Sequence, residues 1–365
     1  MTILTRHWPR SGLVGLIGMP LLLLACLAYF WAFSSNLDVY GGESGLLQYT
    51  LNVHDHLVYV SGIDRVRDGS LVYEVSNDLG IAMIYAALAS AFPALVSPDF
   101  TMLAFVFNCA TLCGVYMAYA QICNELGVSA WAKVAFFANL SLVYFAQLIN
   151  KDMLSVLVFL LAVLWGIRGK WLWLLLALPL LALVRQQLAV FAILYVVLMR
   201  TRHPIRMILL GYVVTSIVAA VLSIFAGIIG EESLGDGFSL YLIDFNRQYY
   251  VGYLLFNPVR VVQYVLDALR SFDLSTETGG IDTAKLLRWP QLILLLMLGR
   301  ELVQLVTRFR AWFSTPAKPL VMVVVAYLLA WLMNPTVNAR YVMLITPVLV
   351  LFAYEVKKLA SARST

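Results

Sequence analysis

Charge is scarce in this sequence. Only 12% of the residues are Asp, Glu, Lys or Arg, whereas 62% are hydrophobic. A helix needs about 20 consecutive apolar residues to cross a bilayer, and residues 12–33 and 205–229 are two of the runs that reach this length. The composition therefore argues against an ordinary soluble protein and predicts an all-α, polytopic transmembrane bundle.

Cysteine and histidine are also scarce, with four of each. Three of the cysteines lie inside apolar runs, which argues against a disulfide framework. His54 and His56 flank Asp55, but alternate residues of a helix point in different directions, and no second histidine pair follows at ligand spacing. We therefore expect no histidine-based zinc site, and a divalent cation such as Mg or Mn, held by carboxylates, is the more plausible metal.

The apolar runs are spread evenly along the chain, which predicts one integral membrane domain over residues 1–365 rather than two soluble domains. The first run is too long for a signal peptide and lacks a small-residue cleavage site, so we expect it to stay as a helix. The net charge of +5 lies mostly in short basic clusters between the runs. Such clusters are typical of cytoplasmic loops, so nucleic acid is not an expected partner.

The basic clusters predict the orientation of the chain, because positive charge accumulates on the cytoplasmic side. Both termini should be cytoplasmic, and so should the turns at Arg168 and Arg200. This works only if residues 79–96 lie in the outer interface, or enter the membrane and return. About ten crossings then remain, near residues 12–33, 101–122, 134–149, 153–167, 172–184, 187–199, 207–229, 290–307, 319–334 and 341–356.

With this topology, the long loops fall on the outer face. Residues 34–100 form the first outer loop, with a surface helix and a half-buried segment, and residues 230–289 form the second large one. Val53 to Val66 has the apolar stripe of an amphipathic helix that lies along the membrane, and Tyr249 to Phe272 is similar. The inner loops are short, so we expect the functional site on the outer face.

Polar residues interrupt the apolar sequence at three outer turns. In Asn150-Lys151-Asp152, Asp152 could simply cap the next helix, but a cap does not explain Lys151 on a face that disfavours positive charge. The turn Arg185-Gln186-Gln187 and the segment Asn338-Ala339-Arg340-Tyr341 break the same bias. Each could be no more than a polar helix end. Alternatively, Arg185, Arg340 and Lys151 could together clamp a phosphate, which a guanidinium binds through two hydrogen bonds.

The order of these features resembles the GT-C glycosyltransferases, membrane enzymes that take sugars from polyprenyl-phosphate or pyrophosphate donors. The first outer loop of that family is similar to Asp55-His56-Leu57-Val58-Tyr59 followed by Asp68-Gly69, with a half-buried segment like Asn77-Asp78-Leu79-Gly80 after it. Asp152 matches a second outer aspartate, Arg185 a basic residue at the next outer turn, and Arg340-Tyr341 with Pro347 the start of the last helix. Bacterial repeat-unit polysaccharide polymerases share this layout.

The resemblance implies a glycosyltransferase of the bacterial inner membrane that acts at its external face in cell-surface polysaccharide or glycolipid synthesis. Asp55 would be the general base and Asp152 would orient the acceptor or a metal ion, with Asp38 as a rival because Asp55 lies further from the first helix than is usual in the family. A saccharide or lipid-linked acceptor and membrane lipids would be the other partners. A repeat-unit polymerase and a flippase for lipid-linked saccharides are the alternatives. The predicted substrate-binding residues are Lys151, Arg185, Gln186, Arg340, Tyr341 and Tyr59.

Overall fold

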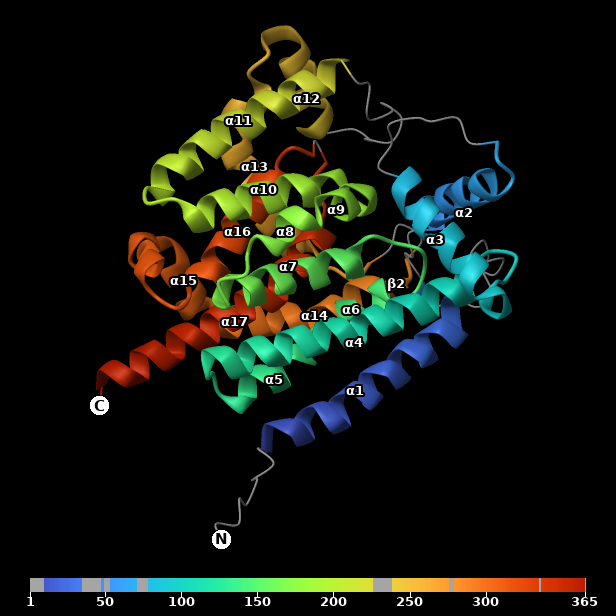
Figure 1. Cartoon of the computed structure of the whole chain (residues 1–365), viewed down its shortest axis with the longest axis horizontal. Coiled ribbons are helices and arrows are strands. Elements are labelled where there is room, and N and C mark those ends of the chain that lie inside the picture. The colour runs from blue at the N-terminus through green and yellow to red at the C-terminus, as the bar shows by residue number, and fades with distance from the viewer. Residues whose placement is uncertain are drawn as a thin grey trace.

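Helices make up most of the structure, a computed structural model that describes residues 10–34, 47–48, 53–70, 78–225, 238–275, 279–334 and 336–364 (Figure 1). The one strand pairing of named strands in these ranges joins β1 (Leu47–Gln48) to β2 (Ile281–Asp282) in parallel. It connects the two segments predicted as large outer loops. The helices are α1 (Arg10–Tyr29), α2 (Val53–Arg67), α3 (Leu79–Ala91), α4 (Thr101–Leu126), α5 (Ala130–Phe136), α6 (Ser141–Phe145), α7 (Asp152–Ile167), α8 (Trp173–Leu176), α9 (Leu178–Val184), α10 (Gln186–Arg200), α11 (Pro204–Phe225), α12 (Phe238–Tyr249), α13 (Gly252–Arg270), α14 (Thr283–Met297), α15 (Gly299–Thr307), α16 (Lys318–Trp331) and α17 (Ala339–Ser364).

Several of these helices could cross a membrane. Among the described residues, α4, parts of α11 and α17, and the stretch Val14–Ser34, which continues α1, are long and apolar enough. Helices α14 and α15 meet the test only together, and they are bent by 63° at their junction. Helices α3, α7, α10 and α16 are apolar but shorter. The structure therefore agrees with a membrane protein of four, or with the bent pair five, candidate spans.

Three predicted crossings are interrupted in the structure. Residues 172–184 divide at Ala177 into α8 and α9. Residues 134–149 do not form one helix, because α5 ends at Phe136 and the short α6 follows. Asn139 and Ser141 lie at this break, and polar side chains that compete for backbone hydrogen bonds weaken a helix interior. Residues 290–307 likewise contain the bend between α14 and α15.

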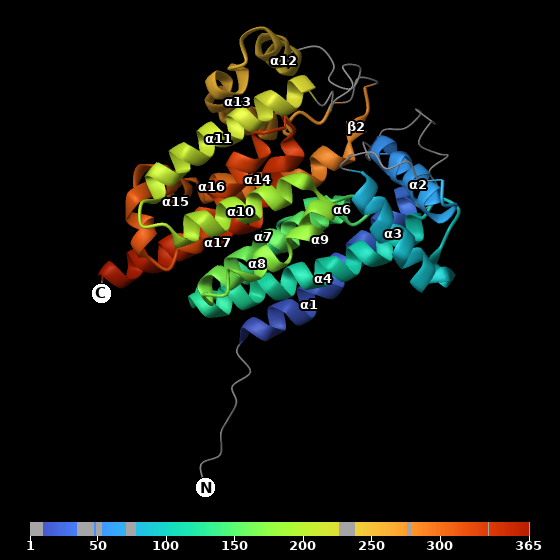
Figure 2. The ribbon, with the colours of Figure 1, turned by 45° about the horizontal axis from the view of Figure 1, so that its top comes forward.

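The two ends of the bundle differ in the chemistry of their contacts. At one end, where α1 begins and α17 ends (Figures 1 and 2), Arg168 pairs with Glu125 at 2.9 Å and Arg200 lies over the ring of Trp171. Lys318 donates to the Met199 carbonyl there. We call this the basic end. The helix ends at residues 152, 185 and 340 lie at the opposite end.

The core lies between α4, α7, α10, α16 and α17. Phe159 of α7 is fully buried at its centre. Its ring makes edge contacts with Phe191 at 4.9 Å and with Tyr327 and Trp331 at 5.3 Å. Edge-to-face packing of this kind adds about 0.5–1.5 kcal/mol per pair beyond the burial of area. It joins the helices that carry the polar turns at 152 and 185.

Helices α2 and α3 pack on each other at the opposite end from the basic clusters, around the buried Tyr59 and Tyr85. The helix predicted over Val53 to Val66 is confirmed as α2. Gly80 lets α3 approach α9, because a Cβ at this position would lie 1.9 Å from the Leu183 carbonyl oxygen. A larger residue there would force the two helices apart.

Candidate functional site

The turn before α7 is organised by Asn150. Its Oδ1 accepts from the backbone N–H of Asp152 at 3.0 Å and of Met153 at 3.4 Å, while its amide donates to the carbonyls of Phe145 and Leu148. The prediction that Asp152 caps α7 is therefore wrong. Asp152 is the first residue of the helix, where a negative charge suits the helix dipole and the side chain is left for other contacts.

Arg185 reaches Asp152 from the junction of α9 and α10. Its backbone is extended, with φ −165°, so α9 ends and α10 begins at this residue. The Arg185 Nη2 lies 3.1 Å from Oδ1 of Asp152, and the two side chains are only 12% and 4% exposed. The guanidinium also lies 5.6 Å from the ring centroid of Trp331. Breaking a buried pair of this kind costs about 3–5 kcal/mol, since one charge is left uncompensated.

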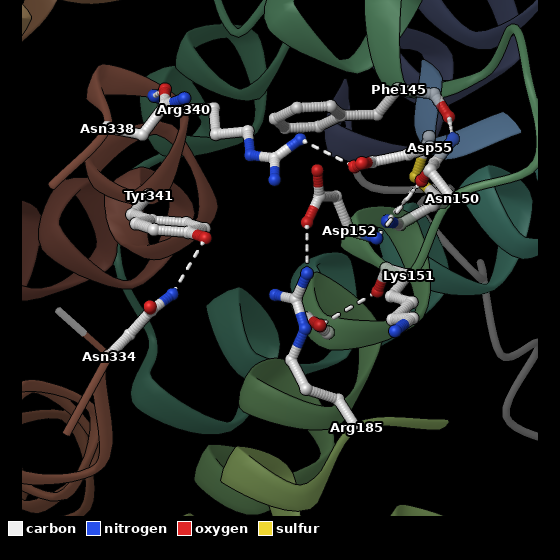
Figure 3. Close-up of polar contacts among 12 residues, drawn as sticks. Asp55, Phe145, Asn150, Lys151, Asp152, Arg185, Asn334, Asn338, Arg340 and Tyr341 are labelled. Carbon is white, nitrogen blue, oxygen red and sulfur yellow. Dashed lines mark hydrogen bonds and ion pairs between the residues drawn. The ribbon is translucent and has the colours of Figure 1, made fainter. Parts of the chain in front are cut away.

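Arg340 forms a second ion pair in the same place. It is the second residue of α17, and its Nη1 lies 3.5 Å from Oδ2 of Asp55 on α2. It also interacts electrostatically with Asp152. The structure thus brings together Asp55, Asp152, Arg185 and Arg340, and Figure 3 shows both guanidinium groups directed toward the two carboxylates.

Two buried nitrogens of the cluster formed by these four residues can donate further hydrogen bonds. Among the described residues, Nη1 of Arg185 and Nε of Arg340 have no hydrogen-bond partner. Buried donors are almost always satisfied, and leaving one unpaired costs about 1–3 kcal/mol. Both nitrogens are able to donate a hydrogen bond to an anion that reaches them.

The helix ends add to this preference for an anion. Arg185 precedes α10, Arg340 lies in the first turn of α17, and Lys151 precedes α7. Helix N-termini carry partial positive charge and disfavour cations, so none of the three positions suits a basic residue for helix stability. The same N-termini favour phosphate or carboxylate groups.

Lys151 lies beside the cluster and is paired elsewhere. Its Nζ lies 2.9 Å from Oδ1 of Asp78 and 5.2 Å from the ring centroid of Tyr59. Burial lowers the pKa of the Lys151 ammonium to about 8, although Asp78 opposes the shift. Tyr59 is a buried residue of α2, and burial raises the pKa of its hydroxyl.

His56 attaches α2 to the turn at 150–152. The imidazole is fully buried and its Nδ1 accepts from the backbone N–H of Ile149 at 3.2 Å. Burial lowers the pKa of His56 to about 4, so the ring is neutral at physiological pH. His56 therefore fixes the position of the neighbouring Asp55, and the side chain of His54 lies outside the described residues.

Other predicted residues have different places. Tyr341 accepts a hydrogen bond on its hydroxyl from the Asn334 amide at 3.1 Å, and its ring lies 5.4 Å from the guanidinium carbon of Arg340. Gln186 is the first residue of α10. Asp38 lies outside the described residues.

Sequence reasoning missed Arg288 and Tyr144, which lie within electrostatic range of Arg340. Arg288 stands near the start of α14, and its Nη1 lies 3.4 Å from the Ser271 hydroxyl. The available signal was a cation just before the apolar run that begins at Pro290, the same pattern as at Arg340.

The described residues do not fit a divalent cation well. They contain no group of three or more His, Cys, Asp or Glu side chains that could hold one. Asp55 and Asp152 each face a guanidinium instead, and a metal ion would have to displace these arginines. We derive no chemical step through a metal.

Comparison of the chain with models of protein families, with curated proteins and with solved structures finds no match.

Proposed function

We propose that the chain is an integral-membrane glycosyltransferase that takes a sugar from a polyprenyl-linked phosphate donor. One observation carries the proposal. Two arginines from different helices, each largely shielded from solvent, converge on two aspartates, and within the part of the chain that the structure describes each keeps a buried donor nitrogen without a partner. Each arginine can therefore donate to a phosphate oxygen while it keeps its aspartate, and charge-assisted hydrogen bonds of this kind are strong.

The donor phosphate would bind between Arg185 and Arg340, with Arg288 close enough to interact with a second phosphate group. Guanidinium groups bind phosphate oxygens through paired hydrogen bonds, and here they are held rigid by Trp331 and Tyr341. Cations already in place stabilise the charge that develops on a departing phosphate without reorganising. A lipid-linked leaving group also accounts for a site at the end of the helices, where headgroups lie.

Asp55 would be the general base. The acceptor hydroxyl oxygen forms a bond to the anomeric carbon, the bond from that carbon to the phosphate oxygen breaks, and the electron pair leaves with the phosphate. The hydroxyl proton passes to the Asp55 carboxylate. Asp55 is 37% exposed and Asp152 only 4%, so an acceptor can reach Asp55, whereas Asp152 is better placed to hold Arg185.

The proposal also includes the number of membrane crossings and their orientation. We place about ten crossings in a bacterial inner membrane, with both termini cytoplasmic and the site on the external face. The GT-C likeness belongs to the same proposal and is supported by the order of Asp55, Asp152, Arg185 and Arg340 along the chain.

The test is transfer from a synthetic polyprenyl-phosphate sugar in proteoliposomes. Asp55→Asn should lower product formation by at least about a hundredfold, the scale of a lost general base, with little change in melting temperature. Asp244→Asn, a matched change of a side chain that is 72% exposed on α12, should leave turnover unchanged. Near-normal turnover in Asp55→Asn would remove Asp55 from the mechanism. Translocation of the lipid-linked sugar without any transfer would contradict the proposal.

A further inference from the structure

A groove at the basic end of the bundle is separate from the site above. It lies where α11 begins and has a volume of about 500 Å³. One side comes from the start of α11 and the other from the end of α15 and the segment after it, and both adjoin helices that are apolar enough for a membrane. Its lining residues are Ile205, Val306, Thr307, Arg308, Phe309, Arg310 and Ala311.

The bend between α14 and α15 creates this groove. Because α15 turns by 63° from α14, it leaves the direction of the bundle. Leu302 and Leu305 pack against the core, but Val303 and Val306 on the same helix are 60% and 77% exposed. Exposed valines at the end of a membrane bundle are in contact with lipid.

The segment that carries the arginines is held in place. Residues Phe309–Ser314 form a short 3₁₀ helix, and the Trp312 indole within it donates to the Gln304 carbonyl at 2.8 Å. The Trp312 ring also packs edge-on to Phe352 of α17, with centroids 5.2 Å apart. These contacts hold the backbone at Arg308 and Arg310 in place.

The cations in the groove differ from others at the basic end. Arg168 pairs with Glu125 and Lys358 with Glu355, whereas within the described part of the chain no ion pair involves Arg308 or Arg310. No acidic residue lines the groove. Two exposed guanidinium groups beside an apolar wall are complementary to a ligand that has an anionic head and a hydrocarbon body.

We propose that this groove binds the headgroup of an anionic phospholipid. The phosphodiester would accept hydrogen bonds from Arg308 and Arg310, and the acyl chains would lie along Val306 and Phe309. Basic pockets between membrane helices suit such headgroups, and a guanidinium suits phosphate oxygens. Free phosphate would use only the polar half of the groove, so the apolar wall favours the lipid.

Native mass spectrometry of the full-length protein in mild detergent can test this. Wild-type protein is titrated with phosphatidylglycerol, with phosphatidylcholine and with inorganic phosphate. We expect phosphatidylglycerol to bind at least about tenfold more tightly than phosphatidylcholine, and Arg308→Gln/Arg310→Gln to lose this preference, since hydrogen bonds to a charged group are removed. The control Arg168→Gln/Lys170→Gln removes the same charge from the same end and should keep it.

Arg308→Lys/Arg310→Lys keeps the charge and guards against misfolding, and it should still prefer phosphatidylglycerol. Undiminished phosphatidylglycerol binding by Arg308→Gln/Arg310→Gln would overturn the proposal. An equal loss in the control would overturn it too, by showing a general effect of net charge. Inorganic phosphate bound as tightly as the lipid would also refute it, because the apolar wall would then contribute nothing.

Discussion

Lys151 and Asp152 are adjacent residues with separate partners. The two side chains are about equally buried, but Asp152 pairs with Arg185 and Lys151 with Asp78. Burying a charge costs several kcal/mol unless a partner compensates it. The two opposite pairings keep both charges in place and tie the turn at 150–152 to α3 and to α10.

Lys151 should give the protein a distinctive pH dependence. Burial holds its folded-state pKa at about 8, below the usual 10.5. Between these values the unfolded chain binds more protons than the folded one, so this group makes the protein more stable as the pH rises from about 8 to 10.5. Below about pH 8 its contribution is unfavourable and constant.

The comparison of wild type with Lys151→Met isolates this effect from other titrating groups. The melting temperatures of the two detergent-solubilised proteins are compared at each pH. The melting temperature of Lys151→Met, relative to that of the wild type, should be higher at pH 7 than at pH 10, because the wild type gains stability as the pH rises. The other partner, Asp78, is 46% exposed, so it stays solvated when Lys151 is removed. Parallel pH profiles for the two proteins would contradict the assignment.

Single residues of the site could be found from the sequence where they departed from the expected charge bias. Arg185 and Arg340 stand out because cations are unusual at helix ends that the charge bias predicts to face outward, and the structure brings both to the aspartates. The cap of α7 could not be assigned, since Asn150 and Asp152 are both good capping residues and the helix start decides between them. Arg288 was missed because it lies within a segment assigned to a loop.

At the level of elements, periodicity was reliable where one helix face is polar. Residues 53–66 form a helix as predicted. The helix predicted over residues 249–272 begins only at Gly252, because Tyr250 has a positive φ of 61° that separates α12 from α13. Continuous apolar runs gave no such information, so the interruptions within 134–149, 172–184 and 290–307 were not foreseen. Hydropathy measures the preference for lipid, and a bend depends on what packs against the helix.

Arg260 joins α13 to the segment that follows α16. It is fully buried and donates to the carbonyl of Leu332 at 2.7 Å and to that of Asn334. These carbonyls follow the end of α16, where backbone acceptors have no partner within the helix. Asn334 in turn donates to Tyr341, next to Arg340. Arg260 is thus a positioning residue for the start of α17.

Replacing Arg260 with Met keeps most of the volume and leaves the carbonyls unpaired. We expect a loss of about 1–3 kcal/mol of stability for each buried acceptor left unsatisfied, measured as a lower midpoint of thermal unfolding, together with weaker donor binding. Arg270→Met on the same helix is the control. Arg270 is 81% exposed and pairs with Asp267, and such surface pairs contribute about 0–1 kcal/mol. Equal effects of the two substitutions would mean that Arg260 does not organise the loop.

At the scale of the whole molecule, the site depends on contacts between distant segments. Asp55 comes from α2 and Arg340 from the last helix, while β1 and β2 join the two segments predicted as large outer loops. The sequence shows which segments are apolar but not which of them pack together. The shared end of the bundle could be inferred from charge bias, whereas the pairing of Arg340 with Asp55 and of Arg185 with Asp152 required the folded structure.

The convergence of Arg185 and Arg340 can be tested through phosphate binding. If Arg185 and Arg340 hold one phosphate, then Arg185→Ala and Arg340→Ala should each weaken binding of a polyprenyl-phosphate donor by about 1.5–3 kcal/mol, the usual contribution of a hydrogen bond to a charged group. The double variant should lose less than the sum, since a phosphate already released by one substitution has little left to lose. Binding is measured by isothermal titration with each variant in the same detergent.

The two arginines also interact with Asp152, so a coupling could arise in the protein without any donor. The same four proteins are therefore unfolded in the absence of donor, and the coupling in stability is subtracted from the coupling in binding. A remainder above about 0.5 kcal/mol supports a shared phosphate, because independent sites add within that margin. A remainder of zero would leave two separate ion pairs, and the phosphate would have to bind elsewhere.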